Sequence, residues 1–339
     1  MKVAEVRNAL KKYDQDTLIE LFVSAYKMAP KARKEDELDP LIMDYKKVIE
    51  DRKSTGKTKK NAIVDFAALE NEIELFISNA YDQNYVAPNR VVPKAKRSKW
   101  RFMVKGYIKQ LTTVTVDDSN YESSVKLLLS LYKMLCYGCG YYIFSTDDPF
   151  NSIGMQQPNL YRIVAERTFA TGYSPQKIRA MINLAVEECL SREALHTYMY
   201  FELANLLKTP DLKNIAILEA KEMIVEENTR HQETLSKMTK KERRHYNMRH
   251  ADYEHERIIN ELSELVMILY LVLQEFMEGV PFFYKTYQEK DKEIILFILL
   301  RTASMIEDNK IWKQVYEDGI KRGIEPRESL QEMYKELKV

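Results

Sequence analysis

Apolar residues recur every three or four positions along most of the chain, which predicts a protein built mainly from α-helices. The first clear example is the set Leu18, Leu21, Phe22, Ala25 and Met28. The same spacing returns over residues 62–81, 100–111 and 121–137. Residues 83–99 break the pattern and contain two prolines, so we expect an extended crossing segment there.

The most apolar stretch of the chain lies late, in Ile258–Glu278. Its residues 265–274 carry no charge, but this run is far shorter than the roughly 20 residues needed to span a membrane. On one continuous helix, four glutamates would share a narrow sector toward its two ends, and the middle would be apolar on every side. These glutamates are Glu261, Glu264, Glu275 and Glu278. We therefore expect a helix whose middle is covered by neighbouring helices.

The helix that contains this stretch is expected to be long. Thr239 and Glu242 have the spacing of a capping box, which marks the start of a helix. Gly279 and Pro281 are typical of a helix end. A single helix between these signals would run for about 40 residues and about 60 Å.

Other local signals divide the rest of the chain. A hydroxyl residue followed by proline is a typical helix start, and it occurs at Ser174-Pro175 and Thr209-Pro210. The longest clear loop is 145–159, which suggests a boundary. We expect an N-terminal helical region over residues 1–145, with a basic segment at 83–116. A C-terminal helical region, 146–339, would surround the long central helix.

Short echoes in the first half suggest repeated helical units. Residues 21–26 are similar to residues 75–81, and residues 24–28 are similar to residues 130–134. Such spacing is typical of two-helix repeats, although chance similarity between apolar helices explains the echoes equally well. We expect an all-α fold, a multi-helical array of helical hairpins with a solenoid-like architecture of the TPR, HEAT or armadillo (ARM) type.

The segment Leu10–Arg33 reads LKKYDQDTLIELFVSAYKMAPKAR. It resembles the opening helix pair of an uncharacterised family of bacterial all-helical, repeat-like proteins, in which a short polar turn precedes a Leu-rich helix ending in Tyr-Lys. The resemblance covers this N-terminal segment alone. It implies a bacterial helical-repeat protein without a particular chemistry, and it assigns no functional residue.

Charge and cysteine content narrow the classes of function. The 339 residues include 52 Lys and Arg against 51 Asp and Glu, so no overall field favours a nucleic acid or a membrane. The N-terminal residues lack the apolar core of a signal peptide. Three cysteines do not make a disulfide framework. We expect a cytoplasmic protein that does not contact membranes, and the sequence does not predict its oligomeric state.

One segment departs from the charge balance, because residues 83–116 contain no acidic residue. Its candidate contacts to an anion are Arg90, Lys94, Lys96, Arg97, Lys99, Trp100, Arg101, Lys105 and Lys109. Cations neutralise phosphates and aromatic rings stack on bases, so the segment fits a sequence-tolerant nucleic-acid contact. A solvated helix whose aromatic rings face the core would give the same pattern, as would pairing with acidic neighbours in the fold.

A second basic cluster comes just before the apolar stretch. It consists of Lys237, Lys240, Lys241, Arg243, Arg244 and Arg249. An exposed helix face accounts for these residues. If the two basic clusters met on one surface, the binding hypothesis would be stronger.

The cysteines suggest a metal or redox site that the pattern does not support well. Cys136 and Cys139 form a CxxC motif at the predicted end of a helix, whereas redox chemistry uses this motif at a helix start. Cys189 and His196 would be needed to complete a zinc site, in a spacing that matches no common arrangement. Buried or helix-ending cysteines explain the motif.

A carboxylate and a histidine three positions apart occur at Glu193 and His196, as in carboxylate-bridged di-iron bundles. Asp252 and His255 would be a degenerate second copy. The pattern requires Glu in both copies and an inward Glu from each of two more helices.

The sequence contains no P-loop, dinucleotide fingerprint or nucleophile elbow. We therefore expect a non-enzymatic cytoplasmic helical-repeat protein that acts as a scaffold or adaptor for a protein partner, without catalytic residues, cofactor or metal. The first alternative is a nucleic-acid-binding accessory protein that uses residues 90–109. The second alternative is a metal-binding helical-bundle enzyme.

Overall fold

The computed structural model describes residues 9–28, 38–43, 65–239, 248–306 and 308–337. The chain divides into two compact units, Met1–Asp65 and Phe66–Val339. In the first unit, helix α2 (Gln15–Met28) begins after Asp14, whose carboxylate accepts a hydrogen bond from the backbone N–H of Thr17. The short helix α4 (Asp39–Met43) follows, and Tyr26 donates a hydrogen bond to Asp39.

The second unit is all-helical in its described part, apart from turns and one isolated bridge. Its helices are α6 (Phe66–Tyr81), α7 (Lys94–Arg97), α8 (Trp100–Thr113), α9 (Tyr121–Gly140), α10 (Pro149–Ile153), α11 (Gln157–Phe169), α12 (Pro175–Val186), α13 (His196–Leu206), α14 (Pro210–Lys237), α16 (Met248–Val272), α17 (Phe276–Thr286), α18 (Lys292–Met305), α19 (Asn309–Lys321) and α20 (Glu328–Glu336). The expected all-α class is confirmed.

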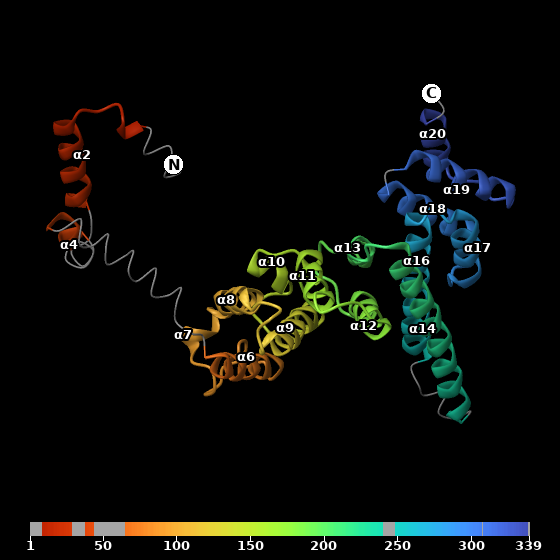
Figure 1. The fold of residues 1–339 in the computed structure, drawn as a ribbon, viewed down its shortest axis with the longest axis horizontal. Helices are drawn as coiled ribbons and strands as arrows, with labels where there is room; N and C mark the ends of the chain where they lie inside the picture. Colours follow the sequence, from red (N-terminus) through yellow and green to blue (C-terminus); the bar gives the residue numbers. More distant parts are fainter. Residues whose placement is uncertain (1–8, 29–37, 44–64, 240–247, 307, 338–339) are drawn as a thin grey trace. The chain divides into compact units, whose positions relative to one another are not determined.

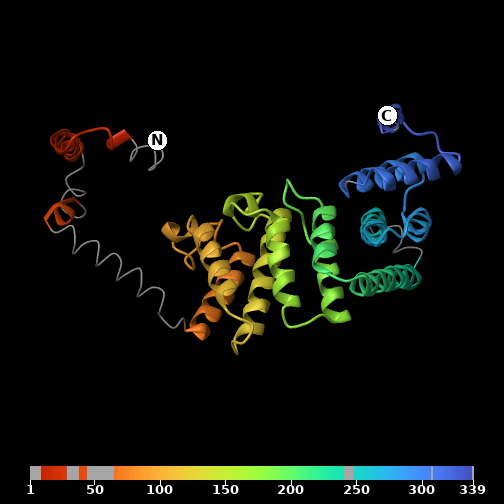
Figure 2. The same ribbon diagram turned by 45° about the horizontal axis from the view of Figure 1, so that its top comes forward.

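Most helices of this unit pack on helices that are close to them in the chain (Figures 1 and 2). Helices α6 and α8 pack on α9, α9 packs on α11, and α11 packs on α12 and α13. Helix α12 contacts α14 and α16, α13 contacts α16, and α14 and α16 pack closely on each other. Among the C-terminal helices, α17 packs on α16 and α18, and α18 packs on α19.

Several helix starts agree with the local signals. The side chain of Ser174 accepts a hydrogen bond from the N–H of Lys177 at the start of α12. The side chain of Thr209 accepts one from the N–H of Leu212 at the start of α14. The expected loop 145–159 contains the short helix α10 and lies inside the second unit.

The apolar middle of α16 is the best-covered part of the fold, as expected. Every residue from Leu262 to Tyr270 is buried. Helix α16 contacts α12, α13, α14, α17 and α18, so apolar side chains on all its sides meet other helices. None of the helices among the described residues is long and apolar enough to cross a membrane.

The expected single helix up to Gly279 is wrong at its C-terminal end. Helix α16 ends at Val272, Gln274 adopts a left-handed φ of 62°, and α17 runs on past Gly279 and Pro281 to Thr286. The predicted start at Thr239 and Glu242 lies partly outside the described residues, which resume at Met248. The chain therefore makes two helices that pack on each other where the sequence suggests one.

The expected sector of four glutamates on one continuous helix is also wrong. Glu264 is buried and accepts a hydrogen bond from Thr197 of α13. Glu261 is partly buried and accepts one from Tyr200 of the same helix. Glu275 and Glu278 are exposed at the start of α17, so the four side chains do not share a helix.

Candidate functional site

Three of the four aromatic residues of the basic segment face the core. Trp100 is 2 % exposed and stacks on Phe144, with 4.0 Å between ring centroids. Tyr107 is buried and donates a hydrogen bond to Glu72 of α6. Burial, with a smaller effect of the Glu72 charge, raises the pKa of Tyr85 to about 12. These three rings anchor α8 and the preceding turn to the fold, and they offer no free face to a base.

The cations of the segment point the other way. We use the name basic surface for seven exposed side chains of α7, α8 and the preceding turn: Arg90, Lys94, Lys96, Lys99, Arg101, Lys105 and Lys109. None of them forms an ion pair with another residue in the described ranges. Phe102 and Val91 lie among them in the sequence and are 70 % and 63 % exposed.

Arg97 has a different role from the other cations. Its guanidinium donates hydrogen bonds to the backbone carbonyls of Val92 and Asn89, at 2.9 Å each. The side chain therefore holds the turn that leads into α7. Arg97 shapes the basic surface and is not available as a free cation on it.

The arrangement of these cations is unfavourable for the isolated fold. Arg101, Lys105 and Lys109 are spaced four residues apart on α8, and like charges at this spacing destabilise a helix by about 0.2–0.5 kcal/mol per pair. Lys99 and Arg101 also lie at the N-terminal end of α8, where the helix dipole disfavours positive charge. An acidic ligand would relieve both effects.

A groove of about 990 Å³ lies next to this surface. Its walls come from the turn between α10 and α11, the first turns of α11, residues 191–194, α13 and the end of α18. The larger apolar side chains in its lining are Phe150, Met155, Tyr198, Phe201 and Met305. Lys105 Nζ lies 3.7 Å from the position that a Cβ would take on Gly154, another lining residue. One edge of the groove therefore meets the basic surface.

Buried polar contacts fix one wall of the groove. Asp148 caps α10 and also accepts a hydrogen bond from Ser191 Oγ at 2.9 Å. Gln157 accepts from the backbone N–H of Ser191 at 2.7 Å and donates to the carbonyl of Cys189 at 3.0 Å. Because both polar side chains are buried and satisfied, they hold the turn before α13 in a defined position.

The groove also contains a charged pair. Arg162 Nε lies 3.8 Å from Glu202, and Arg162 Nη1 lies 2.7 Å from Glu166. Burial raises the pKa of Glu202, whereas the charge of Arg162 lowers it. The groove lining therefore carries one cation, Arg162, against two carboxylates, Glu193 and Glu202, and the cation Lys105 lies at its edge beside Gly154.

The cysteines lie together but are poorly suited to redox chemistry. Burial raises the pKa of the Cys139 thiol to about 12, and it raises the pKa of Cys136 and Cys189 as well. Cys136 and Cys139 are at the C-terminal end of α9, where the helix dipole does not favour a thiolate. The structure thus favours a packing role for the CxxC motif.

The histidine motifs do not assemble a ligand set. His196 Nδ1 is 2.7 Å from the carbonyl oxygen of Ala185, and Glu193 is exposed in the turn before α13, so the pair does not share a helix face. His255 contacts Glu227, and its ring stacks on His231. Among the residues with a described position, no group of three or more His, Cys, Asp or Glu is arranged to hold a metal ion.

The second basic cluster can be placed only at its first residue. Lys237 forms an ion pair with Glu233 at 3.6 Å. Four of its residues lie outside the described part of the chain: Lys240, Lys241, Arg243 and Arg244. The side chain of Arg249 also lies outside it. The expected meeting of the two clusters therefore stays a prediction.

Comparisons with protein-family models, with curated proteins and with solved structures found no match to this chain. The resemblance of its N-terminal segment to a bacterial helical family stays a prediction.

Proposed function

We propose that this protein is a non-enzymatic cytoplasmic scaffold or adaptor that holds an acidic segment of a partner protein. The observation that carries this proposal is the set of seven exposed cations without a counter-ion among the described residues. Acidic side chains of the partner would neutralise the basic surface. Apolar side chains of the same segment would contact Phe102 and enter the adjoining groove.

A protein partner fits the surface better than a nucleic acid. Binding of single strands uses exposed aromatic rings on which successive bases stack. Trp100, Tyr85 and Tyr107 are buried, which leaves Phe102 as the exposed ring of the segment. Methionines such as Met155 and Met305 adapt to apolar side chains of different shapes, as expected for a groove that takes a peptide.

We also propose that the helical array is solenoid-like, with short-range packing repeated along the chain. The order of contacts from α6 to α16 supports this, because each helix packs mainly on near neighbours. Such arrays present an extended surface to a partner rather than a single deep pocket.

The binding proposal is tested with a labelled peptide rich in Glu that contains two Leu residues, measured by fluorescence anisotropy. We expect saturable binding that weakens steeply as salt is raised, because the contact is ionic. The triple variant Lys99→Glu, Arg101→Glu, Lys105→Glu should bind at least about tenfold more weakly. A matched control with the same change of charge is Lys290→Glu, Lys292→Glu, Lys310→Glu, which should bind like the wild type.

Oligonucleotides of DNA and RNA with the same net charge as the peptide complete the experiment. Tighter binding of the oligonucleotides, lost in the triple variant, would replace the proposal by nucleic-acid binding. No binding of either probe at low salt would remove the basic surface as a functional site. Equal loss in the control variant would show that only net charge matters.

A further inference from the structure

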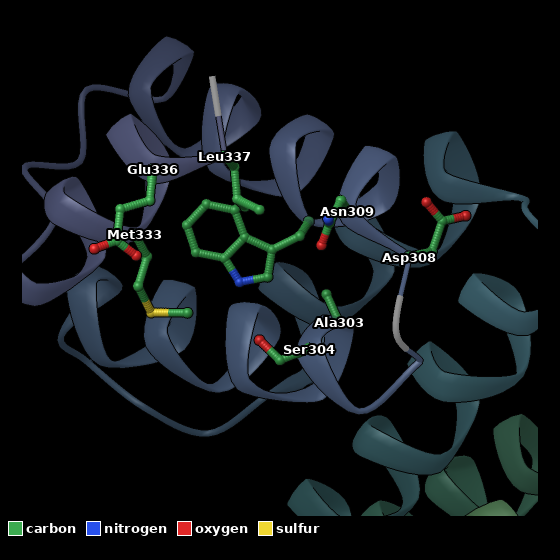
Figure 3. Close-up of a pocket in the computed structure, with 8 residues that line it drawn as sticks. Ala303, Ser304, Asp308, Asn309, Met333, Glu336 and Leu337 are labelled. Carbon is green, nitrogen blue, oxygen red and sulfur yellow. The ribbon is translucent and has the colours of Figure 1, made fainter. Parts of the chain in front are cut away.

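The last three helices enclose a second, smaller pocket (Figure 3). Its volume is about 310 Å³, at the lower end of the range for small-molecule sites. The lining residues are Ala303, Ser304, Asp308, Asn309, Trp312, Met333, Glu336 and Leu337. They come from the end of α18, the start of α19, and α20 with the residue after it.

Trp312 gives this pocket an unused hydrogen-bond donor. The residue is 2 % exposed, and its Nε1–H has no acceptor among the residues that the structure describes. A buried N–H that is not paired costs free energy, so native folds usually supply a partner for it. The ring is held in place, because it stacks on Tyr316, with 14° between the ring planes.

The groups around the pocket determine which kind of hydrogen-bond acceptor could pair with Trp312 Nε1–H. Asp308 is occupied, since its carboxylate caps α19 by accepting from the N–H groups of Lys310 and Ile311. Ser304 Oγ donates to the carbonyl of Leu300. Glu336 adds a second carboxylate to the lining, so an anion is disfavoured. The remaining wall is mainly apolar.

Met333 provides a way for a ligand atom to reach the indole. The residue is 42 % exposed, its side chain is unbranched, and it lines the pocket together with Trp312. A methionine changes rotamer readily and adapts to the shape of a neighbour. Because Nε1–H is buried, a lining side chain has to move before an oxygen atom in the pocket can reach it, and Met333 is the most adaptable of these side chains.

We propose that this pocket binds a small uncharged molecule that combines an apolar body with a carbonyl oxygen, and that this oxygen accepts a hydrogen bond from Trp312 Nε1–H. The site is separate from the basic surface, and it does not depend on the function proposed above. It uses an apolar wall for affinity and a single buried donor for orientation, as small-molecule sites commonly do.

The test follows the indole N–H resonances by NMR while acetophenone is added. The chain has two tryptophans, so two such resonances are expected, and the buried Trp100 is an internal control. We expect a saturable downfield shift of the Trp312 resonance only. The matched probe is α-methylstyrene, which has the same shape without the oxygen. It should bind about fivefold more weakly and should cause no downfield shift.

The variant Trp312→Phe keeps an aromatic ring for Tyr316 and removes the donor. In a ligand-observed titration it should lose the preference for acetophenone over α-methylstyrene, while its thermal unfolding stays cooperative. Equal responses to the two probes in the wild type would overturn the proposal. So would the absence of a saturable shift, or a preference for acetophenone that persists in Trp312→Phe.

Discussion

Glu264 places a carboxylate inside the apolar part of α16, where 7 % of the residue is exposed. Thr197 donates a hydrogen bond to its Oε1 at 2.8 Å, and Arg301 Nη2 lies 3.4 Å from the same oxygen. Burial raises the pKa of Glu264 above its ordinary value, and the charge of Glu261 raises it further. Thr197 and Arg301 act in the opposite direction. The folded state therefore binds the Glu264 proton more tightly than the unfolded state.

We predict that Glu264→Gln stabilises the protein at about pH 8 by about 1 kcal/mol. The amide oxygen still accepts from Thr197, and the variant buries no charge. In the wild type, the buried charge of Glu264 destabilises the fold. As the pH falls through the raised folded-state pKa toward the ordinary value, Glu264 becomes protonated and this destabilisation is lost. The advantage of the variant should therefore shrink at lower pH.

Urea unfolding of both proteins over a series of pH values measures this difference. Other carboxylates titrate in both proteins, so their effects cancel in the comparison. If the wild type is the more stable of the two at about pH 8, the ion pair between Arg301 and Glu264 stabilises the fold by more than the burial of the charge costs, and the prediction is wrong.

At the scale of elements, the junction of α16 and α17 shows a helix end without its usual residue. The N–H of Glu275 donates to the carbonyl of Tyr270, and the N–H of Gln274 donates to that of Leu271. This is the pattern of a Schellman motif, in which the left-handed position normally carries glycine. Here Gln274 occupies it, with a φ of 62°.

Two substitutions near this junction should change stability in opposite directions. Gln274→Gly should stabilise the fold by about 0.5–1 kcal/mol, because glycine adopts a left-handed φ without steric cost. Gly279→Ala should destabilise it by about 1–3 kcal/mol, because the new Cβ would lie 2.6 Å from Tyr270 Cβ. Denaturant unfolding checks both, and a destabilising Gln274→Gly would contradict the role assigned to this turn.

The same junction shows which elements a single sequence can predict. The helix starts at Ser174 and Thr209 were predicted correctly, because each depends on a side chain that caps its own first turn. The end of α16 was missed, because glutamine is not a signal for the left-handed conformation and Gly279 lies inside the next helix. Local signals define helices well only where the expected residue is present.

The candidate site was predictable only in part, for a similar reason. The cations of residues 90–109 could be found in the sequence, and most of them are exposed. The burial of Trp100 depends on Phe144, which is distant in the chain. The groove could not be found, since its walls come from segments between Phe150 and Met305 that only the fold brings together.

At the scale of the whole molecule, a nearly neutral chain carries a strongly positive region. The net charge of the chain is +1, yet the basic surface contains seven cations. A region of one charge sign that has no counter-ions among the described residues lowers stability and favours association with an opposite charge. Stability and binding should therefore respond in opposite ways to changes in this region.

The variant Lys105→Glu tests this relation. It replaces two repulsions on α8, with Arg101 and Lys109, by two attractions, so we predict a gain in stability of about 1 kcal/mol at low salt. The same variant should bind the acidic peptide several-fold more weakly. Thermal unfolding and fluorescence anisotropy measure the two effects, and Lys290→Glu is the control. A loss of stability together with unchanged binding would contradict the role of this surface.

The two indole rings are far apart in the sequence, one at the start of α8 and one in α19, and each stacks on another aromatic ring. In a chain with Trp100→Phe, tryptophan emission reports the C-terminal helices alone, and with Trp312→Phe it reports the region around α8. Melting curves of the two variants, laid over each other, then reveal whether residues 66–339 lose their structure in one cooperative step or from one end first.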